Sequence, residues 1–153
     1  MLNICLTFLL SFLPLHTDAG LDYAEHLKLA NESSDYCMDF FDLMYAHQYD
    51  NSTARGYFGV ATMMQAKVYA NPFTKLSYFN KGKKILETAI QDDQDNVELR
   101  FIRFAVQKKV PDLLFYNNNL KEDKTVLDNY VLHNQDQLAK NIEDFYTLEK
   151  VSS

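Results

Sequence analysis

Glycine and proline are scarce in this sequence of 153 residues, which has only 4 Gly and 3 Pro. A many-stranded sandwich or barrel needs such residues in its tight turns, so their scarcity argues against both architectures. Tryptophan is absent, although 14% of the residues are aromatic. With 47% hydrophobic and 24% charged residues, the composition is that of an ordinary globular protein. The composition therefore favours helices, and the length predicts one domain.

The first twenty residues differ from the rest of the chain. The segment from Leu2 to Leu15 is almost wholly apolar, and Thr17-Asp18-Ala19 places small residues just before Gly20. This layout is typical of a secretory signal peptide, except that no Lys or Arg precedes the apolar run. The run is shorter than the ~20 residues that a membrane-spanning helix needs, and a buried N-terminal helix is the third alternative. We predict a signal peptide at 1–19 and an exported mature domain at 20–153, periplasmic or secreted and not held in the membrane.

Cysteine is almost as rare as tryptophan. The chain has 2 cysteines, Cys5 and Cys37, and removal of 1–19 would leave Cys37 alone. A disulfide within the mature domain is then impossible. Because Cys37 stands in the apolar sequence YCMDFF, we expect a buried and inert thiol.

The charge of the chain is unevenly distributed. The formal net charge is −6, which argues against general binding of nucleic acid. Within the mature domain, residues 51–111 carry ten basic and five acidic side chains, whereas the segments on either side are acidic. A basic centre between acidic flanks predicts either an acidic partner or ion pairs within the protein itself.

Apolar residues recur every three or four positions along the mature chain, which is the period of an α-helix. The fourth predicted helix begins at Asn71-Pro72, a favourable cap followed by proline at the first helical position. Its expected core positions are Leu76, Phe79, Leu86, Ala89 and Ile90. The fold class predicted is all-α, with six to seven helices arranged as antiparallel hairpins, over about 22–30, 34–46, 53–70, 72–92, 97–108, 120–132 and 136–150.

One stretch carries a more specific pattern. Gly82, Leu86 and Ala89 follow a small, large, small spacing on one helix face, and Asp95-Asn96 forms the turn to the next helix. This resembles the second helix and turn of a tetratricopeptide (TPR) unit. Through NPFTKLSYFNKGKK, VELRFIRFAVQKKVP and YNNNLKEDK, the chain is similar to small, exported, uncharacterised bacterial proteins with TPR-like helices. The resemblance implies a scaffold fold and export, and it implies no activity.

No motif of an enzyme or a metal site is present. The sequence contains no HExxH, CxxC, GxSxG or Walker-type GK[ST]. The acidic cluster at 92–98 lacks the spacing and the glycine of a calcium loop, and it is better explained as the cap of the following helix. We expect no catalytic residues, no cofactor and no metal.

The candidate partner-binding residues are Arg100, Arg103 and Tyr57. The two arginines lie three residues apart on the type of helix that lines the groove of TPR arrays, where they could hold carboxylates. The alternative is that they pair with the protein's own acidic flanks. We therefore expect a non-enzymatic scaffold that binds an unidentified protein or peptide, with an acidic segment as the expected chemistry. Met and Phe at helical spacing leave one alternative open, a carrier of a small apolar ligand held between the helices, and an enzyme with a site assembled across helices is a weaker third.

Overall fold

The computed structural model describes residues 26–27, 30 and 33–151, and within them it confirms the all-α fold class. Between residues 33 and 151 the chain forms six α-helices and two short 3-10 helices, and no strand occurs among the described residues. The elements are α2 (Ser34–His47), α3 (Ser52–Met64), η1 (Gln65–Lys67), α4 (Pro72–Asp92), α5 (Val97–Lys109), η2 (Asp112–Leu114), α6 (Leu120–His133) and α7 (Gln137–Val151).

The predicted signal peptide at 1–19 lies outside the described residues. Of the helix predicted at 22–30, His26, Leu27 and Ala30 are described and helical, and the last two are completely buried. None of the described helices is both long and apolar enough to cross a membrane.

Side-chain caps set the beginnings of four helices. Ser33, Asn51, Asn71 and Asn96 each accept a hydrogen bond from a backbone N–H in the first turn of the helix that follows. Pro72 occupies the first turn of α4 as the sequence predicts. Helix α5 ends before Pro111, because Val110 takes the extended conformation that a residue preceding proline prefers. The third helix ends at Met64 instead of near residue 70, because its last turn tightens into η1.

Helices α3 and α4 form the most extensive helix contact of the described structure, and glycines permit their close approach. A Cβ placed on Gly82 would lie 2.3 Å from the carbonyl oxygen of Gly59 and 2.6 Å from the backbone nitrogen of Met63. Neither glycine can therefore carry a side chain without moving a helix. The prediction that Gly82 sits at a close helix contact is confirmed.

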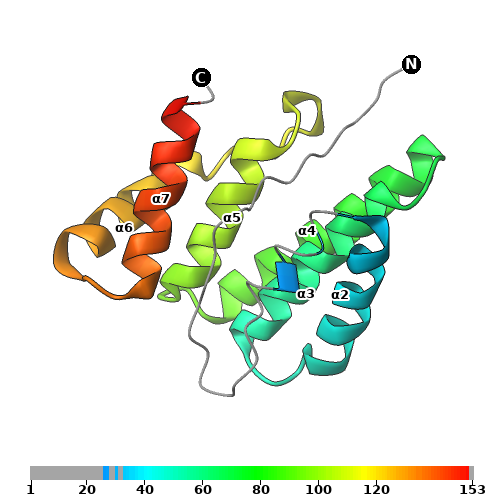
Figure 1. Ribbon diagram of the computed structural model, residues 1–153, viewed down its shortest axis with the longest axis horizontal. Helices are drawn as coiled ribbons and strands as arrows, with labels where there is room; N and C mark the ends of the chain where they lie inside the picture. Colours follow the sequence, from blue (N-terminus) through cyan, green and yellow to red (C-terminus); the bar gives the residue numbers. More distant parts are fainter. Residues whose placement is uncertain (1–25, 28–29, 31–32, 152–153) are drawn as a thin grey trace.

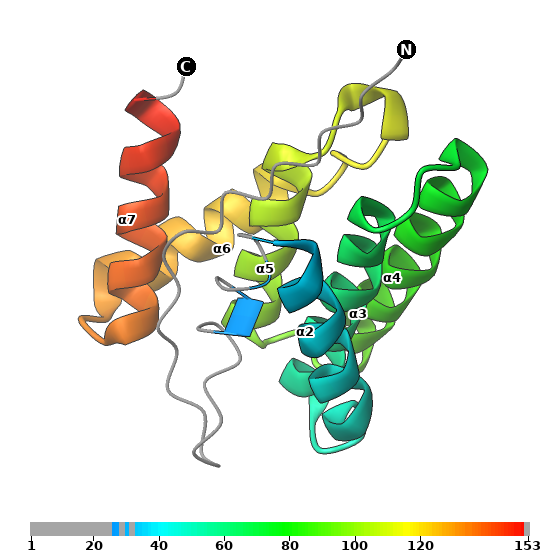
Figure 2. The same ribbon diagram turned by 45° about the vertical axis from the view of Figure 1, so that its right-hand side comes forward.

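The helices form two groups joined through α5. Helices α2, α3 and α4 lie together on one side, α6 and α7 on the other, and α5 between them (Figures 1 and 2). The ring of Phe145 on α7 meets the edges of Phe101 and Phe104 on α5, with centroids 5.7 and 6.0 Å apart. One continuous core of buried side chains runs through both groups.

Candidate binding site

Arg103 is an internal residue of the fold. Its side chain is only 4% exposed, and that of Asp123 on α6 is completely buried. The guanidinium donates two parallel hydrogen bonds to this carboxylate, from Nε to Oδ2 at 2.7 Å and from Nη2 to Oδ1 at 2.6 Å. Its Nη1 donates a third, to Glu87 Oε2 on α4 at 2.8 Å. One arginine thus joins three helices.

Tyr116, in the connection between α5 and α6, extends this cluster. Its buried hydroxyl donates to Glu87 Oε1 at 2.6 Å, and its ring meets the edge of Phe79 at 6.0 Å. Burial, and then the adjacent Glu87 carboxylate, raise the pKa of Tyr116 above its ordinary value. For Arg103, burial acts to lower the pKa, but the hydrogen bonds and charges of Asp123 and Glu87 outweigh it and raise the pKa. Both groups therefore keep their protons at neutral pH.

Arg100 lies at the edge of the same cluster. Its Nη1 donates to Glu122 and, at 3.2 Å, to Asp123 Oδ1, and its other nitrogens reach the carbonyl oxygen of Gln94. The hydrogen bond from Arg100 lowers the pKa of Glu122. The structure therefore brings the two predicted arginines together with carboxylates of the protein, two of them from the acidic segment after residue 111. This arrangement is the alternative in which the arginines pair internally.

Tyr57 lies apart from the arginines, in the core between the helices, and is completely buried. Tyr57 and Arg103 expose almost no surface to a docked partner in this conformation. A role for Arg100, Arg103 and Tyr57 in partner binding stays a prediction. The surface where large apolar side chains are exposed together lies elsewhere.

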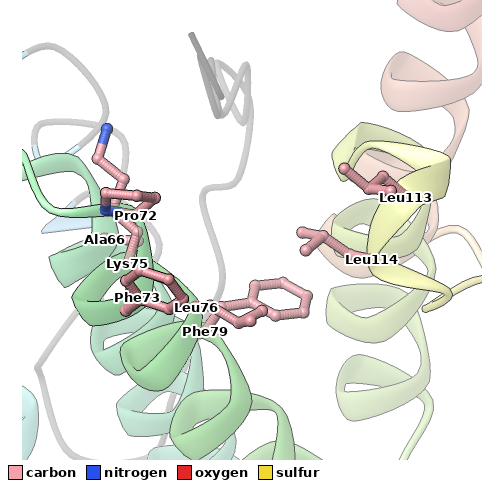
Figure 3. A pocket seen from close by; sticks show the side chains of 8 residues that line it. All are labelled: Ala66, Pro72, Phe73, Lys75, Leu76, Phe79, Leu113 and Leu114. Atoms are coloured by element: carbon pink, nitrogen blue, oxygen red, sulfur yellow. The ribbon is translucent and has the colours of Figure 1, made fainter. Parts of the chain in front are cut away.

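That surface is an apolar cleft between the beginning of α4 and the short helix η2 (Figure 3). Its volume is about 260 Å³, and its lining residues are Ala66, Pro72, Phe73, Lys75, Leu76, Phe79, Leu113 and Leu114. Phe79 and Leu114 point toward one another across it. Phe73 is 82% exposed, Leu113 60% and Leu76 45%, which is unusual for such large apolar side chains so close together.

The position of Leu76 corrects a sequence-based expectation. Leu76 shares the helix face of Phe79 and was expected in the core, as its spacing indicates. On the first turns of α4, however, this face lines the cleft across from η2 and is not covered by a packed helix, so Leu76 stays 45% exposed. The apolar face of α4 is thus buried from Phe79 onward and open before it.

The cluster of Arg103, Asp123, Glu87 and Tyr116 fixes the wall of the cleft that η2 forms. Helix α5 stops at Val110-Pro111, and Phe115 turns the chain in the left-handed conformation, with φ of 47°, which costs a non-glycine residue about 1 kcal/mol or more. Tyr116, anchored on Glu87, then fixes the end of this turn against α4. The buried network therefore positions Leu113 and Leu114 opposite Leu76 and Phe79. The sequence pattern gave no signal for this pairing, because the two walls lie about 37 positions apart in the chain.

The lining of the cleft is suited to apolar contact. Lys75 is the one ionisable side chain in its lining. Within the described ranges, no three His, Cys, Asp or Glu side chains gather where they could hold a metal ion. Comparison with protein-family models, curated proteins and solved structures gives no match.

Proposed function

We propose that the protein is a non-enzymatic, exported scaffold of TPR-like helices that binds a segment of another protein. The observation that carries this proposal is the open cleft with Phe73, Leu76 and Leu113 at its mouth. Covering apolar surface contributes about 25 cal/mol per Å² removed from water, so a partner gains most by seating its own apolar side chains there. Such pockets, filled by one or two anchor residues, dominate the affinity of many interfaces.

The size of the cleft favours a protein segment over an enclosed small molecule. Its volume of about 260 Å³ lies below the ~300–1,000 Å³ of pockets that enclose a drug-sized ligand. Its mouth also carries exposed apolar side chains, those of Phe73, Leu76 and Leu113. The space suits one or two apolar side chains of a longer chain that continues across the surface.

The charge around the cleft indicates the flanking chemistry of that segment. Lys75 stands at its rim in the N-terminal turn of α4. An acidic residue next to the apolar anchors would meet this basic end of the helix. The occupant we propose is therefore an apolar segment with an acidic flank.

Selection of random dodecapeptides on the purified protein tests this proposal. We expect enrichment of peptides with an aromatic or aliphatic anchor next to Asp or Glu. Their binding is lost in Leu113→Asp and retained in Leu132→Asp, a matched change at an exposed leucine of α6 outside the cleft. Selected peptides that bind Leu113→Asp as well as the original protein would overturn it.

A further inference from the structure

A second cleft lies between α5, α6 and α7. It measures about 750 Å³ and is lined by Phe104, Lys108, Leu120, Lys121, Lys124, Asp128, Tyr146, Glu149 and Lys150. This volume lies well inside the range of ~300–1,000 Å³ for sites that hold small molecules. The second cleft therefore differs from the apolar cleft in both size and charge.

The floor of the second cleft is aromatic and aliphatic. Phe104 of α5 and Tyr146 of α7 meet edge to face, with centroids 6.0 Å apart and planes at 81°. Leu120, at the start of α6, completes this apolar surface. The ammonium group of Lys124 lies over the Tyr146 ring, 4.9 Å from its centroid, in a cation–π contact. One positive charge therefore lies directly above the floor of the cleft.

The walls carry more positive than negative charge. Four lysines line the cleft against two carboxylates. Asp128 is paired with Lys124 at 2.6 Å, and Glu149 is paired with Lys109 and, at 3.7 Å, with Lys108. No ion pair within the described chain includes Lys121 or Lys150. Both carboxylates are thus neutralised by their own lysines, and two ammonium groups remain to attract an anion.

We infer that the second cleft binds a small amphipathic anion, with an apolar body on Phe104, Leu120 and Tyr146 and a carboxylate or similar head group held by Lys121 and Lys150. Apolar contact supplies most of the affinity, and the two lysines select for a charged head over a neutral one. The overall charge of −6 opposes anions at long range, which makes this basic cleft an exception on an acidic protein. The inference is independent of the proposed partner cleft, because the two clefts share no residue.

Titration with decanoate, followed by chemical-shift mapping of backbone amides, tests the inference. Decanol serves as the uncharged ligand of the same chain length. We expect saturable shifts centred on α6 and the C-terminal half of α7 with decanoate, and weaker binding of decanol. The double variant Lys121→Gln, Lys150→Gln should weaken decanoate binding roughly tenfold. The matched double variant Lys84→Gln, Lys140→Gln, which makes the same charge change outside the cleft, should leave it unchanged.

A gain of binding provides a second test. Asp128→Asn removes a negative charge from the cleft and releases Lys124, so decanoate should bind more tightly than to the original protein. Leu113→Asp, in the apolar cleft, should have no effect. Equal binding of decanol and decanoate, equal effects of the two lysine variants, or binding to anionic phosphatidylglycerol vesicles without binding of monomeric decanoate would overturn the inference.

Discussion

Arg103 and Asp123 form a two-pronged ion pair in the interior, with N–O distances of 2.7 and 2.6 Å. The pair joins α5 to α6, and through Glu87 it reaches α4 and the connection that carries Leu113. A charge pair buried to this degree has lost its hydration, so each partner depends on the other. The pair is thus part of the framework that shapes the apolar cleft.

Asp123→Asn should be strongly destabilising. The substitution leaves the buried Arg103 guanidinium without the charge of the carboxylate that accepts two of its hydrogen bonds. We expect a loss of about 3–5 kcal/mol in the free energy of unfolding, measured with urea. Glu122→Gln is the matched control, because its exposed side chain also pairs with Arg100; its cost should stay below about 1 kcal/mol. Similar small effects of both variants would contradict the framework role of Arg103.

Gly82→Leu should destabilise the contact between α3 and α4. The first added carbon would already lie 2.3 Å from the Gly59 carbonyl oxygen, which belongs to the backbone and can move only with its helix. We expect a loss of about 1–3 kcal/mol by overpacking, read from the urea midpoint. Thr88→Leu adds bulk at an exposed position of the same helix and should change stability by no more than about 0.5 kcal/mol. An unchanged midpoint for Gly82→Leu would show that the helices separate freely at this point.

Tyr116→Phe should loosen the wall of the apolar cleft. It removes the hydroxyl that donates to Glu87 and should cost about 1–2 kcal/mol. Hydrogen exchange of the amides at 113–116 should become faster, because the turn at Phe115 loses its anchor. Exchange in α7 beyond residue 140 serves as the internal control. Unchanged exchange at 113–116 would mean that packing on Phe79 alone holds the segment.

The pair of Tyr130 and Asp136 should make stability depend on pH at both extremes. The tyrosine hydroxyl donates to Asp136 Oδ2 at 2.5 Å. This bond, with the backbone N–H of Ala139, lowers the pKa of Asp136 below its ordinary 3.8, so its contribution is present above that pH and is lost as the pH falls further. Burial, and then the bond to Asp136, raise the pKa of Tyr130 to about 12, so its contribution is complete below pH 10 and is lost as the pH rises from 10 to 12.

Tyr130→Phe should reduce the loss of stability at both low and high pH. The urea midpoint of the variant, followed from pH 2 to pH 12, should fall less steeply at each end than that of the original protein. The matched variant is Tyr78→Phe, which removes a hydroxyl on another helix that meets the Tyr69 hydroxyl and not a carboxylate. If the loss of stability at low pH is the same in Tyr130→Phe, the backbone N–H groups alone lower the pKa of Asp136.

Export can be checked directly on native material. We expect N-terminal sequencing to begin at Gly20 or within a few residues of it, because Thr17-Asp18-Ala19 has the small residues that a signal peptidase requires. The matched variant Ala19→Arg should block processing and leave the longer chain. Native protein that begins at Met1 would contradict the predicted signal peptide.

Local sequence determined the helices and most of their beginnings. The Asn-Pro pair at 71–72 and the asparagine at 96 specify helix starts through their own side chains and rings, so neighbouring residues suffice to predict them. Gly82 was also predictable, because its spacing to Leu86 and Ala89 places it on the packed face of one helix. Each of these features depends on residues within a few positions of one another.

The tertiary structure alone decided which charged and apolar side chains meet. Arg103 is buried because α6 places Asp123 against it. Leu113 stays exposed because η2 lies across the cleft from α4 and does not pack on it. The helical period gives the face on which a residue lies but not the helix that will cover that face. Such pairings depend on the directions of helices joined by turns, and a left-handed residue such as Phe115 changes that direction without any signal in the pattern.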